Sequence, residues 1–344
     1  MGVALKPVWV ALGFAIGGVF IYLSLRSLDW PTVQAAFAQA HLGWLLLGFP
    51  LCALAFLLRL QRWWLMLAAI GSTATRMQIA APFFGGFALN NLLPFRMGDV
   101  ARAAAFTKSL DVSASGATAS LLVERVFDLY ALLLLGFAAV LALSQTVADF
   151  PLAASMTAIA GLVALLSVLT AVLTVPKALG RLVLRMLKLP FGRLVPQGLT
   201  RFGLRTLIHI SHIVRRQGSL RLIGLSVLAW TIEGGVIYSA VQALGLTSAL
   251  AGPWLAIVSG NLGTLLPGTP GHFGTYHYLA AHALTLAGPD FSAGFLAITL
   301  AHFIIWSSTT VAGFALLLSV GGLSSRFKPR RTTPRAAAER KFPV

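Results

Sequence analysis

Residues 90–99 read NNLLPFRMGD, and the rest of the chain is organised around them. Two asparagines, a helix-breaking proline and the charged residues Arg96 and Asp99 interrupt a sequence otherwise dominated by Leu, Ala, Phe and Gly. Ionisable side chains inside apolar segments are costly in a membrane and tend to mark a pathway or a binding site. More charge follows at Arg102 and in residues 124–128, ERVFD. We therefore expect this region to contain the functional centre of the chain.

The composition places the chain in the membrane class. Hydrophobic residues make up 58% of its 344 residues and charged residues 10%, with a mean hydropathy of +0.85. A soluble domain carries about 25% charged residues. The apolar runs are too long and continuous for the short alternating segments of a membrane β-barrel. We therefore expect an all-α, polytopic helical membrane protein with about 6–8 membrane helices, two of them broken or re-entrant.

The positive charge of the chain fits a membrane setting. A formal net charge of +17 comes from 26 Lys and Arg against 9 Asp and Glu. Most of this charge lies in connections and in the tail, which favours the positive-inside rule and anionic lipid over nucleic acid. We expect both termini on the cytoplasmic side of a bacterial inner membrane. The single cysteine, Cys52, offers no disulfide framework or redox pair, and neither a metal nor a cofactor is expected.

The apolar runs predict where the membrane helices lie. The expected spans are residues 8–25, 42–58, 113–143, 152–175, 222–244 and 291–320. The second span ends at Arg59, Arg62 and the pair Trp63–Trp64, which we interpret as an interfacial anchor. Residues 77–93 contain Pro82 and a Gly pair, and basic residues flank them on both sides. This segment is therefore predicted to enter the bilayer and leave on the same side.

The spans group into one transmembrane domain, residues 1–325, followed by a basic tail, residues 326–344. We expect the tail to be disordered and cytoplasmic. Two repeat-like halves, about 42–175 and 222–320, are joined by a basic cytoplasmic linker at 177–221. Within the linker, apolar and basic residues interleave at 181–188 with near-helical spacing, as in an amphipathic helix on a membrane surface.

Two motifs in the chain resemble one another. Residues 92–98 read LLPFRMG, and residues 265–271 read LLPGTPG. Each follows an apolar run that has Asn near its end, and each precedes a long helix. A positive-inside count makes the two motifs open to opposite sides of the membrane. This pattern indicates an inverted-topology repeat, whose broken helices meet near the midplane and hold a substrate between them.

The candidate substrate-binding residues come from both motifs and from the helices around them. Arginines can hold a phosphate bidentately, and the carboxylates could orient these arginines or bind an amine. Arg125 can reach Asp128 on the same helix, and Glu233 is expected to be neutral or paired across helices, with Arg125 or a histidine as its partner. A structural charge cluster, or a loop with snorkelling arginines, is the alternative. The full set is Asn90, Asn91, Pro94, Arg96, Asp99, Arg102, Glu124, Arg125, Asp128, Glu233, Pro267, Pro270, His272 and His277.

These residues resemble the lysylphosphatidylglycerol synthase transmembrane-domain family, a flippase-like group of bacterial and archaeal membrane proteins. The resemblance is carried by NLLPFRMGD at 91–99, by ERVFD at 124–128 and by PGHFG at 270–274 with His277. In the aminoacyl-lipid synthases this membrane region is coupled to a soluble transferase domain. This chain ends soon after its last span, so the resemblance implies a stand-alone, transport-like member without aminoacyl transfer. Many members carry Glu where His277 stands, which implies a different substrate.

The sequence and the resemblance together predict a flippase-like protein. It would translocate a charged or glycosylated lipid, of phospholipid, polyprenyl-linked or hopanoid type, and its partners would be membrane lipids with anionic head groups. Pathway enzymes or a second copy of the chain are further possible partners. The sequence has no P-loop and no nucleophile motif, so ATP is not an expected power source. The alternatives are an integral-membrane lipid-modifying enzyme, with Asp99 or Glu124 as general base, and a non-transporting scaffold subunit of a lipid- or glycan-synthesis pathway.

Overall fold

The computed structural model describes residues 5–145, 156–157, 159–164, 166–167, 196–266 and 269–323. These residues form helices and no strands, which confirms the all-α class. The helices are α1 (Leu5–Arg26), α2 (Trp30–Ala38), α3 (Leu42–Ala69), α4 (Arg76–Leu92), η1 (Pro94–Arg96), α5 (Met97–Ala104), α6 (Thr107–Leu110), α7 (Ala114–Leu143), α10 (Gln197–Gln217), α11 (Ser219–Ala243), α12 (Gly252–Gly263), η3 (Pro270–His272), α13 (Thr275–Thr285) and α14 (Phe291–Leu323).

Four of the described helices, α3, α7, α11 and α14, are long and apolar enough to cross a membrane. A fifth span is possible if α1 and α2, which are bent by 82°, are taken together. This bend arises because Asp29 caps a new helix, in which its Oδ2 accepts a hydrogen bond from the Thr32 backbone N–H at 3.3 Å. The expected span at 152–175 lies mostly outside the described residues, and the surface helix at 181–188 and the tail at 326–344 lie wholly outside them.

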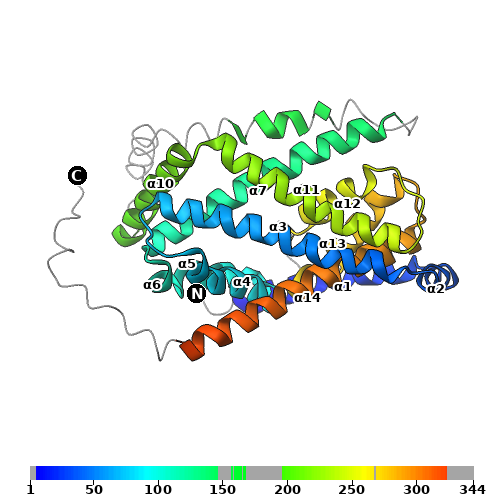
Figure 1. Cartoon of the computed structure of the whole chain (residues 1–344), viewed down its shortest axis with the longest axis horizontal. Coiled ribbons are helices and arrows are strands. Elements are labelled where there is room, and N and C mark those ends of the chain that lie inside the picture. The colour runs from blue at the N-terminus through cyan, green and yellow to red at the C-terminus, as the bar shows by residue number, and fades with distance from the viewer. Residues whose placement is uncertain are drawn as a thin grey trace.

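Helices α3 and α11 run antiparallel and form the central pair of the bundle (Figure 1). At one end the His41 backbone N–H donates to the Ala243 carbonyl at 2.7 Å. At the other end Gln217 Nε2 donates to the Leu65 carbonyl at 2.9 Å. Helix α3 extends to Ala69, well past the expected end of the second span. The turns after Leu58 remain inside the bundle because Arg59 and Arg62 form ion pairs there with Glu233 and Asp128.

Residues 72–111, here called the first hairpin, leave the bundle end and return to it. Thr75 and Gln78 form a capping box at the start of α4, and Pro94 ends the helix. After η1 the chain folds back as α5 and α6. The two ends of the hairpin are joined where Thr73 Oγ1 donates to Asp111 Oδ2 at 2.6 Å. The segment predicted to be re-entrant is therefore one arm of a helical hairpin, helical throughout despite Pro82.

Residues 247–288, here called the second hairpin, repeat this arrangement with α12, η3 and α13. The Ala249 backbone N–H donates to the Ala287 carbonyl at 2.8 Å and joins the two ends. The turn between the helices uses Gly271, with φ of 66°, and Gly274, with φ of 95°, which a residue with a Cβ rarely adopts.

The two hairpins enter the bundle from opposite ends. The first follows the C-terminal end of α3 and the second follows the C-terminal end of α11, and these helices are antiparallel (Figure 1). Their turns meet inside, where Arg96 Nη2 donates to Thr264 Oγ1 at 2.9 Å. Helix α4 packs on α14, and α12 packs on α7. This is the arrangement that an inverted-topology repeat requires.

Candidate functional site

A cavity of about 150 Å³ lies where the turns of the two hairpins meet the central helices. Aromatic rings form part of its wall, from Phe56, Phe87, Trp230 and Tyr276. The polar and charged part of the wall comes from almost every element around it: Arg59, Asn90, Asn91, Arg96, Arg125, Asp128, Glu233, Asn261, Thr264, His272, His302 and Thr309. The cavity therefore combines aromatic and polar walls inside a bundle that exposes many large apolar side chains.

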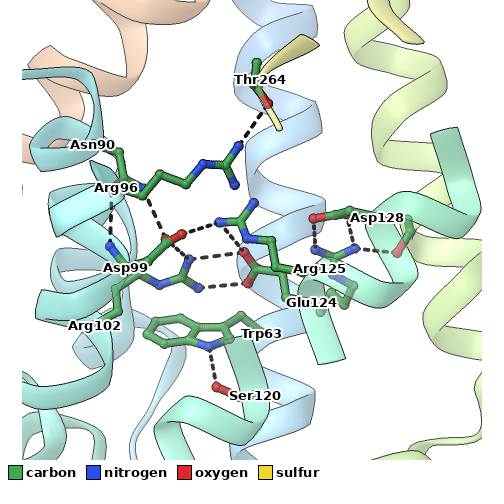
Figure 2. Close-up of polar contacts among 12 residues, drawn as sticks. Trp63, Asn90, Arg96, Asp99, Arg102, Ser120, Glu124, Arg125, Asp128 and Thr264 are labelled. Atoms are coloured by element: carbon green, nitrogen blue, oxygen red, sulfur yellow. Dashed lines mark hydrogen bonds and ion pairs between the residues drawn. The ribbon is translucent and has the colours of Figure 1, made fainter. Parts of the chain in front are cut away.

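Arg102 and Glu124 form the most deeply buried ion pair of the site (Figure 2). Arg102 Nη1 and Nη2 donate to Glu124 Oε1 and Oε2 at 3.2 and 2.9 Å, and the two side chains are 0% and 2% exposed. The guanidinium lies over the Trp63 ring, 4.1 Å from its centroid. Trp63 in turn donates from Nε1 to Ser120 Oγ at 3.0 Å. This pair supports the cavity from behind and does not line it.

Arg125 points toward the first hairpin. The helical spacing predicted that it would pair with Asp128, and it does not. Its Nη2 donates to Asp99 Oδ2 at 2.8 Å and lies 3.8 Å from Glu124 Oε1. Asp99 also accepts a hydrogen bond from Asn90 Nδ2 at 3.1 Å. Figure 2 shows Arg125 between the two carboxylates. The i, i+3 prediction fails because α5 folds back over α4 and brings Asp99 to the guanidinium.

Asp128 pairs instead with Arg62 of α3. Arg62 Nη1 and Nη2 donate to Asp128 Oδ1 and Oδ2 at 2.6 and 3.1 Å. Trp230 Nε1 donates to the same Oδ1 at 3.1 Å, and Arg62 also bonds to Ser226. This carboxylate therefore ties α3, α7 and α11 together.

Glu233 of α11 pairs with Arg59 of α3, and not with Arg125 or a histidine as expected. The guanidinium of Arg59 lies 4.3 Å from the centroid of the Trp230 ring. Both Arg59 and Arg62 are buried, so the interpretation of these arginines and Trp63 as an interfacial anchor is wrong. The sequence did contain a signal for them, because buried acids at Asp128 and Glu233 each require a cation.

Arg96 differs from the other arginines of the site. Its backbone is left-handed, with φ of 50°, at the end of η1. Its side chain reaches across to the second hairpin and donates to Thr264 Oγ1 at 2.9 Å (Figure 2). No carboxylate lies within ion-pair distance of it in the described part of the chain.

Two histidines, His272 and His302, line the cavity, and His277 lies behind His302. His302 Nδ1 and His277 Nε2 are 3.1 Å apart and share a hydrogen bond. His272 lines the cavity, and its buried Nδ1 has no partner among the described residues. No group of three potential metal ligands is found in the ranges that the structure describes.

Seven of the fourteen predicted site residues line the cavity: Asn90, Asn91, Arg96, Arg125, Asp128, Glu233 and His272. Asn91 is fixed by its Nδ2, which donates to Thr309 Oγ1 at 3.0 Å and Thr310 Oγ1 at 2.8 Å. Pro94 and Pro270 begin the two turns. Pro267 lies outside the described residues. Several lining residues were not among the predicted site residues, including Arg59, Thr264, His302, Thr309 and the four aromatic residues.

Comparison with known proteins agrees with this architecture. The family model described as "Lysylphosphatidylglycerol synthase TM region" matches residues 10–313. The UPF0104 membrane protein MJ1078 of Methanocaldococcus jannaschii is 26% identical over 226 residues, which cover 65% of this chain and 91% of that protein. The predicted resemblance is thereby confirmed. The chain is a multi-pass helical membrane protein that belongs to the lysylphosphatidylglycerol synthase transmembrane-region family.

Proposed function

We propose that this protein binds the head group of a membrane lipid in the cavity and moves it between the two leaflets. The observation that carries the proposal is the position of the cavity. It lies where two hairpins from opposite ends of the bundle meet, and it is lined by arginines and amides. A small rearrangement of either turn would expose the same polar site to one side of the membrane or the other.

The surroundings of the turns suit the apolar part of a lipid. Leu92 and Leu93 before the first turn are 45% and 41% exposed, and Leu265 and Leu266 before the second are 70% and 44% exposed. These side chains offer an apolar surface beside a polar cavity. The acyl or prenyl tails of a lipid would therefore remain in the bilayer while the head group crosses through the protein.

The charged residues suit binding better than acid–base chemistry. Glu124 accepts two hydrogen bonds from Arg102 and is buried, so it is poorly placed to take a proton from a lipid. Arg96 and Arg125 line the cavity and present donors that match a phosphate. The candidate lipids are phospholipids and polyprenyl-linked or hopanoid-type lipids of a bacterial inner membrane. Movement would be downhill or coupled to an ion gradient.

Reconstitution of the purified chain into liposomes tests this proposal. Fluorescent phospholipids on the inner leaflet are expected to become accessible to an external quencher faster than in protein-free liposomes. Mass spectrometry of the same lipids is expected to show no chemical change. A changed lipid mass would instead support a lipid-modifying enzyme. Liposomes with neither exchange nor a mass change would contradict transport and favour a scaffold role.

A further inference from the structure

The ion pairs around the cavity leave one positive charge without a counter-charge. Five arginines and four carboxylates belong to this cluster within the described residues, a surplus of one cation. Each carboxylate already accepts a hydrogen bond from an arginine: Asp99 from Arg125, Glu124 from Arg102, Asp128 from Arg62 and Glu233 from Arg59. The arginine that remains is Arg96.

The lining of the cavity includes buried nitrogen atoms that have no hydrogen-bond partner among the described residues. Arg96 uses Nη2 for Thr264 and has no carboxylate partner in the described ranges. Two other lining residues have buried nitrogens without a partner in the part of the chain that the structure describes: Arg59 Nη2, which is a donor, and His272 Nδ1, which is a donor in the tautomer that carries its proton there. A buried donor without a partner costs free energy, and an anion placed among such donors would satisfy them.

We infer that the cavity selects a head group with a single net negative charge, such as a phosphodiester, and rejects one that is net positive, with Arg96 as the residue that determines this specificity. The inference rests on the proposed function and names the substrate class of the same site. A monoanion neutralises the surplus charge of the cluster. An amine would have to displace an arginine from Asp99, Glu124, Asp128 or Glu233, which would leave that arginine buried and unpaired.

The head-group preference can be measured without transport. The full-length protein in detergent is titrated with glycerophosphoglycerol, a monoanionic phosphodiester, and with its lysyl ester, which is net positive. Calorimetry is expected to show at least about tenfold tighter binding of the monoanion, the size expected for a charge-assisted hydrogen bond. Equal binding of the two probes, or tighter binding of the lysyl ester, would overturn the inference.

Inorganic phosphate separates a lipid head group from free phosphate as the natural ligand. At pH 8 it is mostly a dianion, so it would overcompensate the single surplus charge. Binding several-fold weaker than that of glycerophosphoglycerol is expected. Tighter binding of inorganic phosphate would contradict selection of a monoanionic diester.

Substitutions of Arg96 assign the effect to this residue. R96Q is expected to weaken binding of glycerophosphoglycerol about tenfold or more and to abolish the difference between the two probes. R96K, which keeps the charge and loses the planar fork, is expected to retain the preference at reduced affinity. R76Q is the matched control, because Arg76 is exposed at the start of the same hairpin. Unchanged binding by R96Q, with a normal elution profile, would contradict the role of Arg96.

Lipid exchange distinguishes a failure of this inference from a failure of the proposed function. In liposomes, phosphatidylglycerol is expected to exchange faster than lysylphosphatidylglycerol. Exchange of both lipids at one rate would contradict the charge selection and leave transport intact. Selective binding of glycerophosphoglycerol with no exchange of either lipid would support the charge selection and contradict transport.

Discussion

Arg62 of α3 donates from Nη1 and Nη2 to the two oxygens of Asp128 on α7, at 2.6 and 3.1 Å. Arg62 is fully buried and Asp128 nearly so. Removal of one member of such a pair leaves the other charged and unpaired in the bundle. The pair is therefore a structural element of the site, and its loss should be visible in stability before it is visible in binding.

The substitution D128A is expected to lower the stability of the protein by about 3–5 kcal/mol, because Arg62 would remain buried without its partner. The double substitution of Arg62→Met and Asp128→Leu should recover most of this loss, since no charge is left uncompensated. Thermal unfolding in detergent, monitored by fluorescence-detected size exclusion, measures the stability of both variants. A double variant as unstable as D128A would contradict this explanation.

Arg102 and Arg76 provide a matched comparison of buried and exposed arginines. The guanidinium of Arg102 lies 4.1 Å from the Trp63 ring centroid, and that of Arg76 lies 4.5 Å from the Trp64 ring centroid. R102K is expected to cost about 2 kcal/mol or more, because lysine cannot donate bidentately to Glu124. R76K should change stability by less than about 0.5 kcal/mol. Equal melting temperatures for the two variants would contradict a larger stability contribution from the buried Arg102.

The first hairpin depends on a close approach between α4 and α5. A Cβ placed on Gly98 would lie 1.8 Å from the Gly86 carbonyl oxygen. G98A is therefore expected to destabilise the protein by about 1–3 kcal/mol and to displace Asp99 from Arg125. G43A, where no atom lies within 4 Å of the added Cβ, should be neutral or stabilise by about 0.5–1 kcal/mol. A G98A variant with the wild-type melting temperature would contradict the close helix crossing.

The two hairpins should be accessible from opposite sides of the membrane. Thr73 and Thr247 are exposed at the entrances of the first and second hairpins. In a Cys52→Ala background, T73C and T247C should react with a membrane-impermeant maleimide from opposite faces of sealed vesicles. The buried Cys52 of the wild type should react from neither. Labelling of both positions from one face would contradict an inverted arrangement.

Sequence patterns predicted the broken segments well because the causes are local. Pro94 ends α4 and Pro270 begins the turn of the second hairpin, and Arg102, Glu124 and Asp128 lie on helices that face inward. The partners of these charges could not be predicted, because helical spacing gives the face of a side chain and not its neighbour. Asp99 reaches Arg125 only through the fold of the hairpin, and Arg59 and Arg62 follow a pattern that also suits a membrane interface.

Passage of a lipid head group through the cavity between the two hairpins should stop when that cavity is filled. Asn261 lines it on α12, whereas Leu265 of the same hairpin is 70% exposed and does not line it. Rates of phosphatidylglycerol exchange in liposomes are compared for the wild type, N261W and L265W at equal reconstituted amounts. N261W is expected to reduce the rate to that of protein-free liposomes, with L265W close to the wild type. Wild-type exchange by a correctly folded N261W protein would contradict the claim.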